Sequence, residues 1–211
     1  MVPPISYSYQ VGKALAWTIF SSVGARIEGK EHIPASGSVL LVSNHQSYLD
    51  PLFVSLGCPK RQIHFMAKEE LFDFPTSRHM MLGLGAFPVN RNGPGKATLI
   101  EVLKLLRDDR CLCLFAEGTR SKDGTLQDFQ PGFAKIARKT KTSVIPIGIT
   151  GTRKLFEGIQ GMSLPIWSKI IGYPPPVMRI GEPISWELDA EEIATQAQTS
   201  VRKLLEECRG A

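Results

Sequence analysis

The chain has 211 residues, enough for one domain with a substantial core, and its hydrophobic (43%) and charged (21%) fractions are those of an ordinary globular protein. Its net charge of +5 and pI near 9.1 suit an anionic partner such as a membrane surface, a phosphorylated metabolite or a nucleic acid. The sequence contains no zinc-finger spacing and no RNP-like aromatic motif, which argues against nucleic acid.

The N-terminal segment is unusually poor in charge. Lys13 is the only charged residue among the first 25, and residues 14–25 form an uncharged run of twelve. A membrane-spanning helix needs about 20 apolar residues, so this run is too short to cross a membrane. We predict an amphipathic or interfacial helical segment at residues 1–28, with Trp17 and Phe20 at lipid-headgroup depth. A helix docked on the protein's own core has similar aromatic residues, so this alternative stays open.

Residues 29–211 are predicted to form one α/β domain with a mostly parallel or mixed central sheet flanked by helices. Strands are expected from apolar runs at residues 37–43, 61–67, 85–90, 111–116, 143–149 and 177–184. Helices are expected at residues 95–109, 132–140 and 190–208, and a Gly/Pro-rich stretch at about 157–176 is expected to be irregular. Pro146 indicates an edge strand or a bulge. The four cysteines have neither C-x-x-C nor His/Cys ligand spacing, which favours buried free thiols in a reducing compartment.

The stretch SNHQSYLDP at residues 43–51 allows two interpretations. In one, Asp50 caps a helix that has Pro51 at its first position, and His45 is a polar residue in a turn. In the other, His45 and Asp50 form a functional pair, although the same spacing arises by coincidence at His64 and Glu69. Ligands bind beyond the carboxyl ends of strands in α/β sheets, and both this turn and the EGTRS turn directly follow a predicted strand. The two turns are therefore expected to share one edge of the sheet.

Four motifs follow one another along the chain: NHQSYLD (44–50), GAFPVNR (85–91), FAEGTR (115–120) and VIPIGI (144–149). This set, from about residue 29 to 184, resembles the glycerolipid acyltransferases, most closely the bacterial 1-acylglycerol-3-phosphate acyltransferases. The predicted N-terminal helix is similar in position to the membrane-docking segment of that family.

The resemblance implies a catalytic dyad in which His45 is the general base and Asp50 orients and stabilises its imidazole, which suits proton transfer near neutral pH. It also implies substrate-binding roles for a set of residues around the acceptor phosphate: Lys68, Arg91, Glu117, Gly118, Thr119 and Arg120. A G-x-S-x-G nucleophile elbow is absent from the sequence and no cysteine accompanies a motif histidine, so direct attack by the acceptor hydroxyl is expected. No metal and no cofactor is expected.

The expected reaction moves a fatty acyl group from acyl-CoA or acyl-carrier protein to lysophosphatidic acid, giving phosphatidic acid. The expected location is the cytoplasmic face of a membrane, with peripheral or monotopic attachment. Three alternatives stay open: another lysophospholipid or glycerol 3-phosphate as acceptor, a non-catalytic phospholipid-binding protein, and a hydrolase of the same thioester.

Overall fold

The computed structural model describes residues 5–89, 95–160 and 174–210, and these residues form one seven-stranded mixed sheet. Its strand order is β1-β7-β6-β2-β5-β3-β4. The strands are β1 (Arg26–Glu28), β2 (Val39–Ser43), β3 (Ile63–Lys68), β4 (Ala86–Val89), β5 (Cys111–Phe115), β6 (Val144–Thr150) and β7 (Val177–Ile180). Strands β6, β2, β5, β3 and β4 are parallel to one another, whereas β7 is antiparallel to β6 and β1 is parallel to β7.

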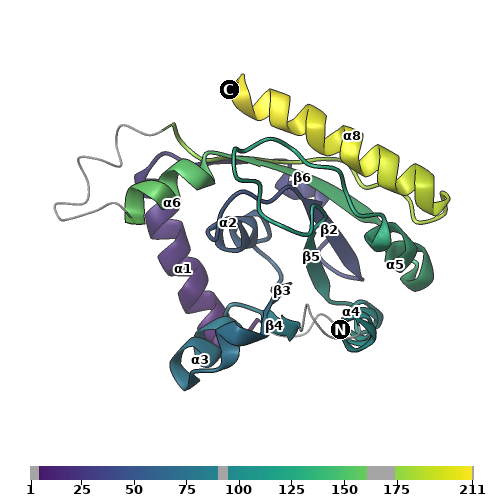
Figure 1. Ribbon diagram of the computed structural model, residues 1–211, viewed down its shortest axis with the longest axis horizontal. Helices are drawn as coiled ribbons and strands as arrows, with labels where there is room; N and C mark the ends of the chain where they lie inside the picture. Colours follow the sequence, from purple (N-terminus) through teal and green to yellow (C-terminus); the bar gives the residue numbers. More distant parts are fainter. Residues whose placement is uncertain (1–4, 90–94, 161–173, 211) are drawn as a thin grey trace.

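Helices cover both faces of the sheet (Figure 1). They are α1 (Tyr7–Ser22), α2 (Asp50–Gly57), α3 (Pro75–Gly83), α4 (Lys96–Arg107), α5 (Gly132–Thr140), α6 (Thr152–Gln160) and α8 (Ala190–Arg209), with short 3-10 helices at Lys30–His32 and Glu69–Phe72. Alternate residues of β2 separate the two cores. Leu41 packs with α1 and α2 on one face, and Leu40 packs with α4, α5 and α8 on the other. The predicted α/β class and mixed, helix-flanked sheet are therefore confirmed.

Most predicted elements occur at or near their expected positions. Helix α5 has the predicted bounds, and β5 ends one residue earlier than expected. All four cysteines are buried free thiols, as predicted. Residues 157–160 belong to α6, so the start of the stretch predicted to be irregular is helical; residues 161–173 of that stretch lie outside the described part of the chain.

The edge-strand interpretation of Pro146 is wrong, because β6 lies between β7 and β2. The antiparallel register changes by one residue across this proline: Val144 bridges to Ile184, whereas Ile147 pairs with Ile180. The carbonyl of Pro146 still accepts a hydrogen bond from the Gly181 amide at 2.9 Å. Proline has no N–H to donate, and Pro146 lies where the pairing of β6 with the chain around β7 changes register. This arrangement fits the predicted bulge.

The N-terminal segment combines a helix with a strand. Helix α1 begins after Ser6, whose hydroxyl accepts a hydrogen bond from the Tyr9 amide at 3.3 Å, and ends at Ser22. Residues 26–28, which we predicted to be helical, form β1 at the edge of the sheet. Phe20 is 1% exposed and stacks on Phe53 at 4.4 Å, so its predicted headgroup location is wrong. Trp17 is 56% exposed. Within the described part of the chain, no helix has both the length and the hydropathy to span a membrane.

Candidate active site

The turns that follow β2, β5 and β6 meet at one edge of the sheet because these three neighbouring strands are parallel. Two hydrogen bonds join the first two turns directly. The His45 amide donates to Glu117 Oε1 at 2.7 Å, and the Ser121 amide donates to the His45 carbonyl at 2.8 Å. The expectation that the two motif turns share an edge is therefore confirmed.

His45 and Asp50 are in direct contact at this edge. Nδ1 of the imidazole lies 2.8 Å from Asp50 Oδ2. Asp50 is the first residue of α2 and is completely buried, whereas the His45 side chain is 15% exposed. The imidazole stacks on the ring of Phe115 with centroids 4.0 Å apart, so the end of β5 limits its rotation.

The Asp50 carboxylate is surrounded by hydrogen-bond donors. Oδ2 accepts from the amides of Gln46 at 2.7 Å and Ser47 at 2.8 Å as well as from His45. Oδ1 accepts from the hydroxyl of Thr152 at 2.5 Å. An ionised carboxylate only accepts, so these contacts place a proton on Nδ1 of the imidazole and leave the Nε2 lone pair available as a base.

These contacts overturn the interpretation of Asp50 as the cap of α2. The N-cap position belongs to Leu49, which makes no side-chain capping bond, and Pro51 follows Asp50 inside the helix. The Asp50 side chain instead closes the preceding turn over the amides of Gln46 and Ser47. The carboxylate therefore fixes the position of the histidine rather than the start of the helix.

Glu117 follows the end of β5 and stabilises the site through its carboxylate. Its Oε1 accepts from the His45 amide at 2.7 Å and its Oε2 from the Gln127 amide at 3.2 Å. Burial raises the pKa of this carboxyl, and the two amide hydrogen bonds oppose the shift. Both oxygens of the Glu117 carboxylate therefore accept from backbone amides.

Gly118 has φ +72° and completes the turn, where a side chain is disfavoured. Thr119 and Arg120 follow it and are exposed. The Arg120 guanidinium carbon lies 3.6 Å from the centroid of the Tyr48 ring, and Tyr48 also contacts Phe156 of α6 with centroids 5.4 Å apart. Arg120 is thus held against the turn that carries His45.

The two other predicted binding residues are Lys68 and Arg91. Lys68 ends β3 at the same edge of the sheet and is exposed, but β5 separates its strand from β2. Arg91 lies outside the described residues. The spacing of His64 and Glu69 is coincidental, since the buried Nε2 of His64 has no hydrogen-bond partner among the described residues.

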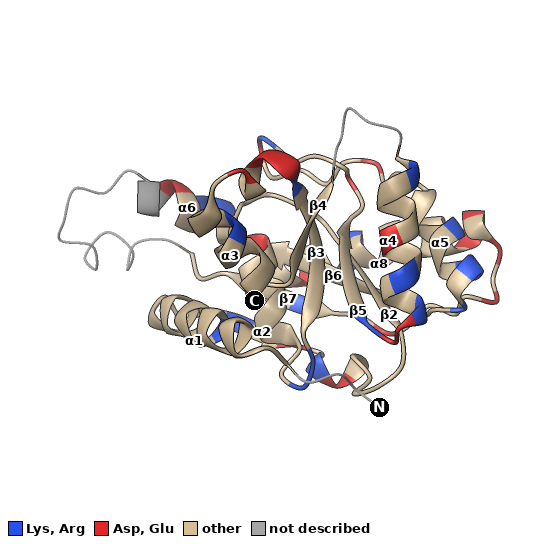
Figure 2. Ribbon diagram, turned by 90° about the horizontal axis from the view of Figure 1, so that it is seen from below, with Lys and Arg blue, Asp and Glu red and all other residues tan. Residues whose placement is uncertain are grey.

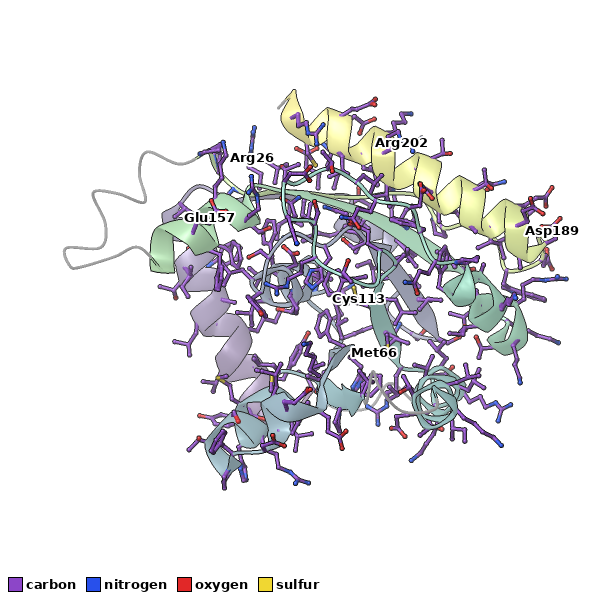
Figure 3. All side chains as sticks on the ribbon, in the orientation of Figure 1. Arg26, Met66, Cys113, Glu157, Asp189 and Arg202 are labelled. Carbon is purple, nitrogen blue, oxygen red and sulfur yellow. The ribbon has the colours of Figure 1, made fainter. Side chains whose placement is uncertain are left out.

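The described residues contain no cluster of three or more His, Cys, Asp or Glu that could hold a metal ion. Cys113 lies near the centre of the molecule, between the sheet and α2 (Figure 3). Burial raises the pKa of its thiol, and the nearby Asp50 carboxylate raises it further. A neutral, enclosed thiol of this kind is a poor nucleophile.

Sequence reasoning missed three residues of the site: Phe115, Tyr48 and Thr152. Phe115 and Tyr48 stood inside the recognised motifs, but no spacing rule indicates a ring contact. Thr152 lies three residues after the VIPIGI motif, so the rule that polar residues gather at carboxyl ends could have found it.

Comparisons with known proteins show which family this chain is similar to. The model of the acyltransferase family, described as Acyltransferase, matches residues 24–150, which is more than half of the chain. The chain is 36% identical over 150 residues to the chloroplastic 1-acyl-sn-glycerol-3-phosphate acyltransferase LPAT1 of Arabidopsis thaliana, covering 69% of this chain and 41% of the relative. It is 32% identical over 134 residues to the 1-acyl-sn-glycerol-3-phosphate acyltransferase of Borreliella burgdorferi, covering 62% and 52%.

A third relative, the 1-acyl-sn-glycerol-3-phosphate acyltransferase of Bacillus subtilis, is 29% identical over 128 residues, covering 61% of this chain and 63% of the relative. The chain thus spans less than two thirds of the length of these three proteins. Among solved structures, the 1-acyl-sn-glycerophosphate (LPA) acyltransferase PlsC from Thermotoga maritima has a TM-score of 0.70 at 24% identity, over 96% of this chain and 83% of that one. This likeness supports the fold.

Proposed function

The chain belongs to the acyltransferase family, and on this premise we propose that it transfers a fatty acyl group from an acyl thioester to the free hydroxyl of lysophosphatidic acid, forming phosphatidic acid. The observation that carries the proposal is the contact of His45 Nδ1 with the buried, four-fold hydrogen-bonded carboxylate of Asp50. Binding a lipid does not require a base of this kind. The names of the relatives in the comparisons support lysophosphatidic acid as the acceptor.

His45 Nε2 removes the proton from the acceptor hydroxyl while the hydroxyl oxygen attacks the carbonyl carbon of the thioester. Asp50 stabilises the imidazolium that forms and holds the Nδ1–H tautomer. When the new C–O ester bond is complete, the C–S bond breaks and the imidazolium returns its proton to the departing thiolate. The donor is acyl-CoA or acyl-carrier protein, which is consumed as a co-substrate, so no resident cofactor takes part.

Arg120 is the strongest candidate among the described residues for binding the acceptor phosphate. Its guanidinium is exposed and rests on Tyr48, three residues after His45, so a bound phosphate would lie beside the base. Lys68 adds a second exposed cation at the same edge of the sheet. We infer that Arg91 completes the binding group, and that Gly118 and Thr119 contribute by bringing the backbone close to the acceptor. Glu117 supports this part of the site by holding the turn that carries His45.

We further propose that α1 attaches the protein to the surface of a membrane, on the cytoplasmic side in view of its four free thiols. Four exposed apolar side chains recur every fourth residue and therefore share a face of α1: Tyr7, Val11, Leu15 and Ile19, with exposures of 83%, 43%, 63% and 38%. Trp17 is also exposed, on another side of the helix, and Figure 2 shows α1 to be almost free of charged residues. A helix with such a surface lies in the interface of a bilayer.

Thiol release from a long-chain acyl-CoA, measured with and without lysophosphatidic acid, tests the reaction. We expect release that requires the acceptor and that falls by about 10²-fold or more in His45→Ala, because a general base contributes about 10²- to 10⁴-fold. His79→Ala is the matched control, since His79 is an exposed histidine of α3. Acceptor-dependent release that persists in a folded His45→Ala protein would contradict the assignment of the base. Release without an acceptor would identify a hydrolase.

The same assay separates the acceptors and donors. Glycerol 3-phosphate and other lysophospholipids present a hydroxyl and a phosphate to the same site, and the expected result is faster thiol release with lysophosphatidic acid than with either. An acyl-carrier-protein donor forms the second arm of the experiment. Equal or faster release with another acceptor would reassign the substrate within the same reaction class.

Vesicle co-sedimentation tests the attachment through α1. The double variant Leu15→Ser with Trp17→Ser removes exposed apolar surface from the helix, so we expect a smaller bound fraction on phosphatidylglycerol vesicles. Gln10→Ala, at an exposed polar position of the same helix, is the control. Unchanged binding of the double variant would exclude α1 as the attachment site.

A further inference from the structure

One oxygen of the Asp50 carboxylate depends on a residue far away in the sequence. Oδ2 takes its three hydrogen bonds from His45, Gln46 and Ser47, all in the turn that Asp50 closes. Among the described residues, Oδ1 has a single hydrogen-bond partner, the hydroxyl of Thr152 at 2.5 Å. Asp50 is 0% exposed, so removal of this hydroxyl would leave a buried anionic oxygen without a partner.

Thr152 is itself held firmly. It is 0% exposed and is the first residue of α6, two residues after the end of β6. The side chain of Asn44 both donates to the Ile149 carbonyl at 3.0 Å and accepts from the Ile149 amide at 2.8 Å, which fixes the end of β6 to the turn of His45. Gly151, at φ +80°, then turns the chain into α6. The hydroxyl therefore reaches Asp50 from a neighbouring strand whose position is already set.

We propose that Thr152 is a positioning residue for the acyl transfer: its hydroxyl fixes the rotation of the Asp50 carboxylate and thereby holds the His45 imidazole in line for proton removal. The effect on rate rests on the function proposed above, whereas the effect on the imidazole does not. Thr152 lies just beyond the residues matched by the family model, which end at 150. No motif recognised in the sequence includes it.

A second buried threonine, Thr142, is a control that distinguishes the positioning role from ordinary structural hydrogen bonding. Thr142 is 1% exposed and its hydroxyl bonds to Ser38 Oγ at 2.7 Å. It precedes β6, whereas Thr152 follows that strand, so the two lie at opposite ends of β6. A valine at either position removes one buried hydroxyl at nearly constant volume, but only the change at Thr152 touches the site.

The test compares Thr152→Val, Thr152→Ser and Thr142→Val in acceptor-dependent thiol release. We expect Thr152→Val to lower kcat by about 10- to 100-fold with KM changed less than about twofold, because a hydrogen bond to a charged group is lost while substrate contacts remain. Thr152→Ser restores the hydroxyl and is expected to keep kcat within about threefold of the wild type. Thr142→Val is expected to keep kcat unchanged even if it lowers stability.

An NMR titration of the His45 ring in the same three variants gives a readout that needs no substrate. Two carboxylates act on this residue, Asp50 at the start of α2 and Glu117 at the end of β5. With the Thr152 hydroxyl removed, the Asp50 carboxylate is no longer held in place against the imidazole, so the titration midpoint of the ring should differ from that of the wild type in Thr152→Val. Thr142→Val should titrate as the wild type does.

A Thr152→Val protein that matches the wild type in both kcat and the His45 midpoint would overturn the positioning role. Equal losses of kcat in Thr152→Val and Thr142→Val, with no change in either midpoint, would also overturn it by assigning a purely structural role. If the wild type shows no acceptor-dependent release, the proposed function fails, and the comparison of midpoints still decides whether Thr152 positions the dyad.

Discussion

The negative charge of Asp50 can be separated from its shape, because asparagine has nearly the same size and one oxygen that still accepts. We expect Asp50→Asn to lower kcat by about 10²- to 10⁴-fold, since the neutral amide no longer stabilises the imidazolium. Acceptor-dependent thiol release measures the loss, and Asp123→Asn serves as a control because Asp123 is an exposed aspartate. A kcat within about threefold of the wild type would argue against a role for this charge.

An alanine substitution at Gly118 tests the role of its turn in acceptor binding, and the same substitution at Gly37 is the matched control. Both have positive φ, +72° and +79°, so alanine at either position should lower the free energy of unfolding by about 1–2 kcal/mol. A Cβ at Gly118 would lie 2.5 Å from the Gln130 amide nitrogen, whereas at Gly37 it meets no atom within 4 Å. Urea unfolding should therefore give similar losses of stability, and only Gly118→Ala should also reduce thiol release. A fully active Gly118→Ala protein would argue against the role of this turn in acceptor binding.

The contrast between Asp50 and Thr152 shows what sequence reasoning could reach at the residue level. His45 and Asp50 were identified because a local motif names both residues. The capping interpretation of Asp50 failed because amides of its own turn occupy the carboxylate, and no propensity rule weighs that competition. Thr152 is 102 positions away from Asp50 in the sequence. Their contact therefore depends on the strand order, which the hydrophobic pattern did not predict.

Among the elements, β3 carries a histidine that should make stability depend on pH. Burial, assisted by the charge of Arg110, lowers the pKa of His64 from 6.5 to about 4. The resulting stabilisation is complete above pH 6.5 and is lost as the pH falls toward 4, because the unfolded chain binds this proton first. One unit of difference in pKa between the folded and unfolded chain corresponds to about 1.4 kcal/mol of unfolding free energy. Because the pKa of His64 falls from 6.5 to about 4, the loss of stability approaches about 3 kcal/mol.

Urea unfolding at several pH values between 7 and 4 measures this effect. As the pH falls from 7 to 4, the wild type should lose more stability than His64→Leu does. The unfolding free energy of the wild type minus that of the variant should therefore fall steadily. His79→Ala, which changes an exposed histidine, should keep the pH dependence of the wild type. A difference that stays constant from pH 7 to pH 4 would contradict the assignment.

Elements with a clear pattern were predicted well, and the missed ones lack such a pattern. Strand β5 and helix α5 bury regular sets of apolar residues, so period and composition located both. Helix α3 was not predicted because Gly83 is its only buried residue, which leaves no apolar stripe to detect. Strand β1 has three residues and pairs only with β7, so its existence depends on a distant partner.

At the scale of the whole molecule, the excess of 25 basic over 20 acidic residues should influence attachment to lipid. Charge attraction is screened within about 10 Å at 0.1 M salt, whereas burial of apolar side chains is not. We expect binding to phosphatidylglycerol vesicles to weaken as salt rises from 0.05 to 0.5 M, and binding to phosphatidylcholine vesicles to be weak throughout. Co-sedimentation across that range is the measurement, and salt-independent binding to the anionic vesicles would contradict a contribution from charge.

The pairing of β1 with β7 also has a consequence during synthesis. The ribosome makes residues 26–28 about 150 residues before residues 177–180, and at about 5–20 residues per second this is a delay of roughly 8–30 seconds. During that time β1 has no strand to pair with, and α1, which leads into it, is already outside the ribosome. During the delay the nascent chain therefore also exposes Tyr9, Ala16 and Phe20 of α1, which the folded protein buries, to any nearby bilayer.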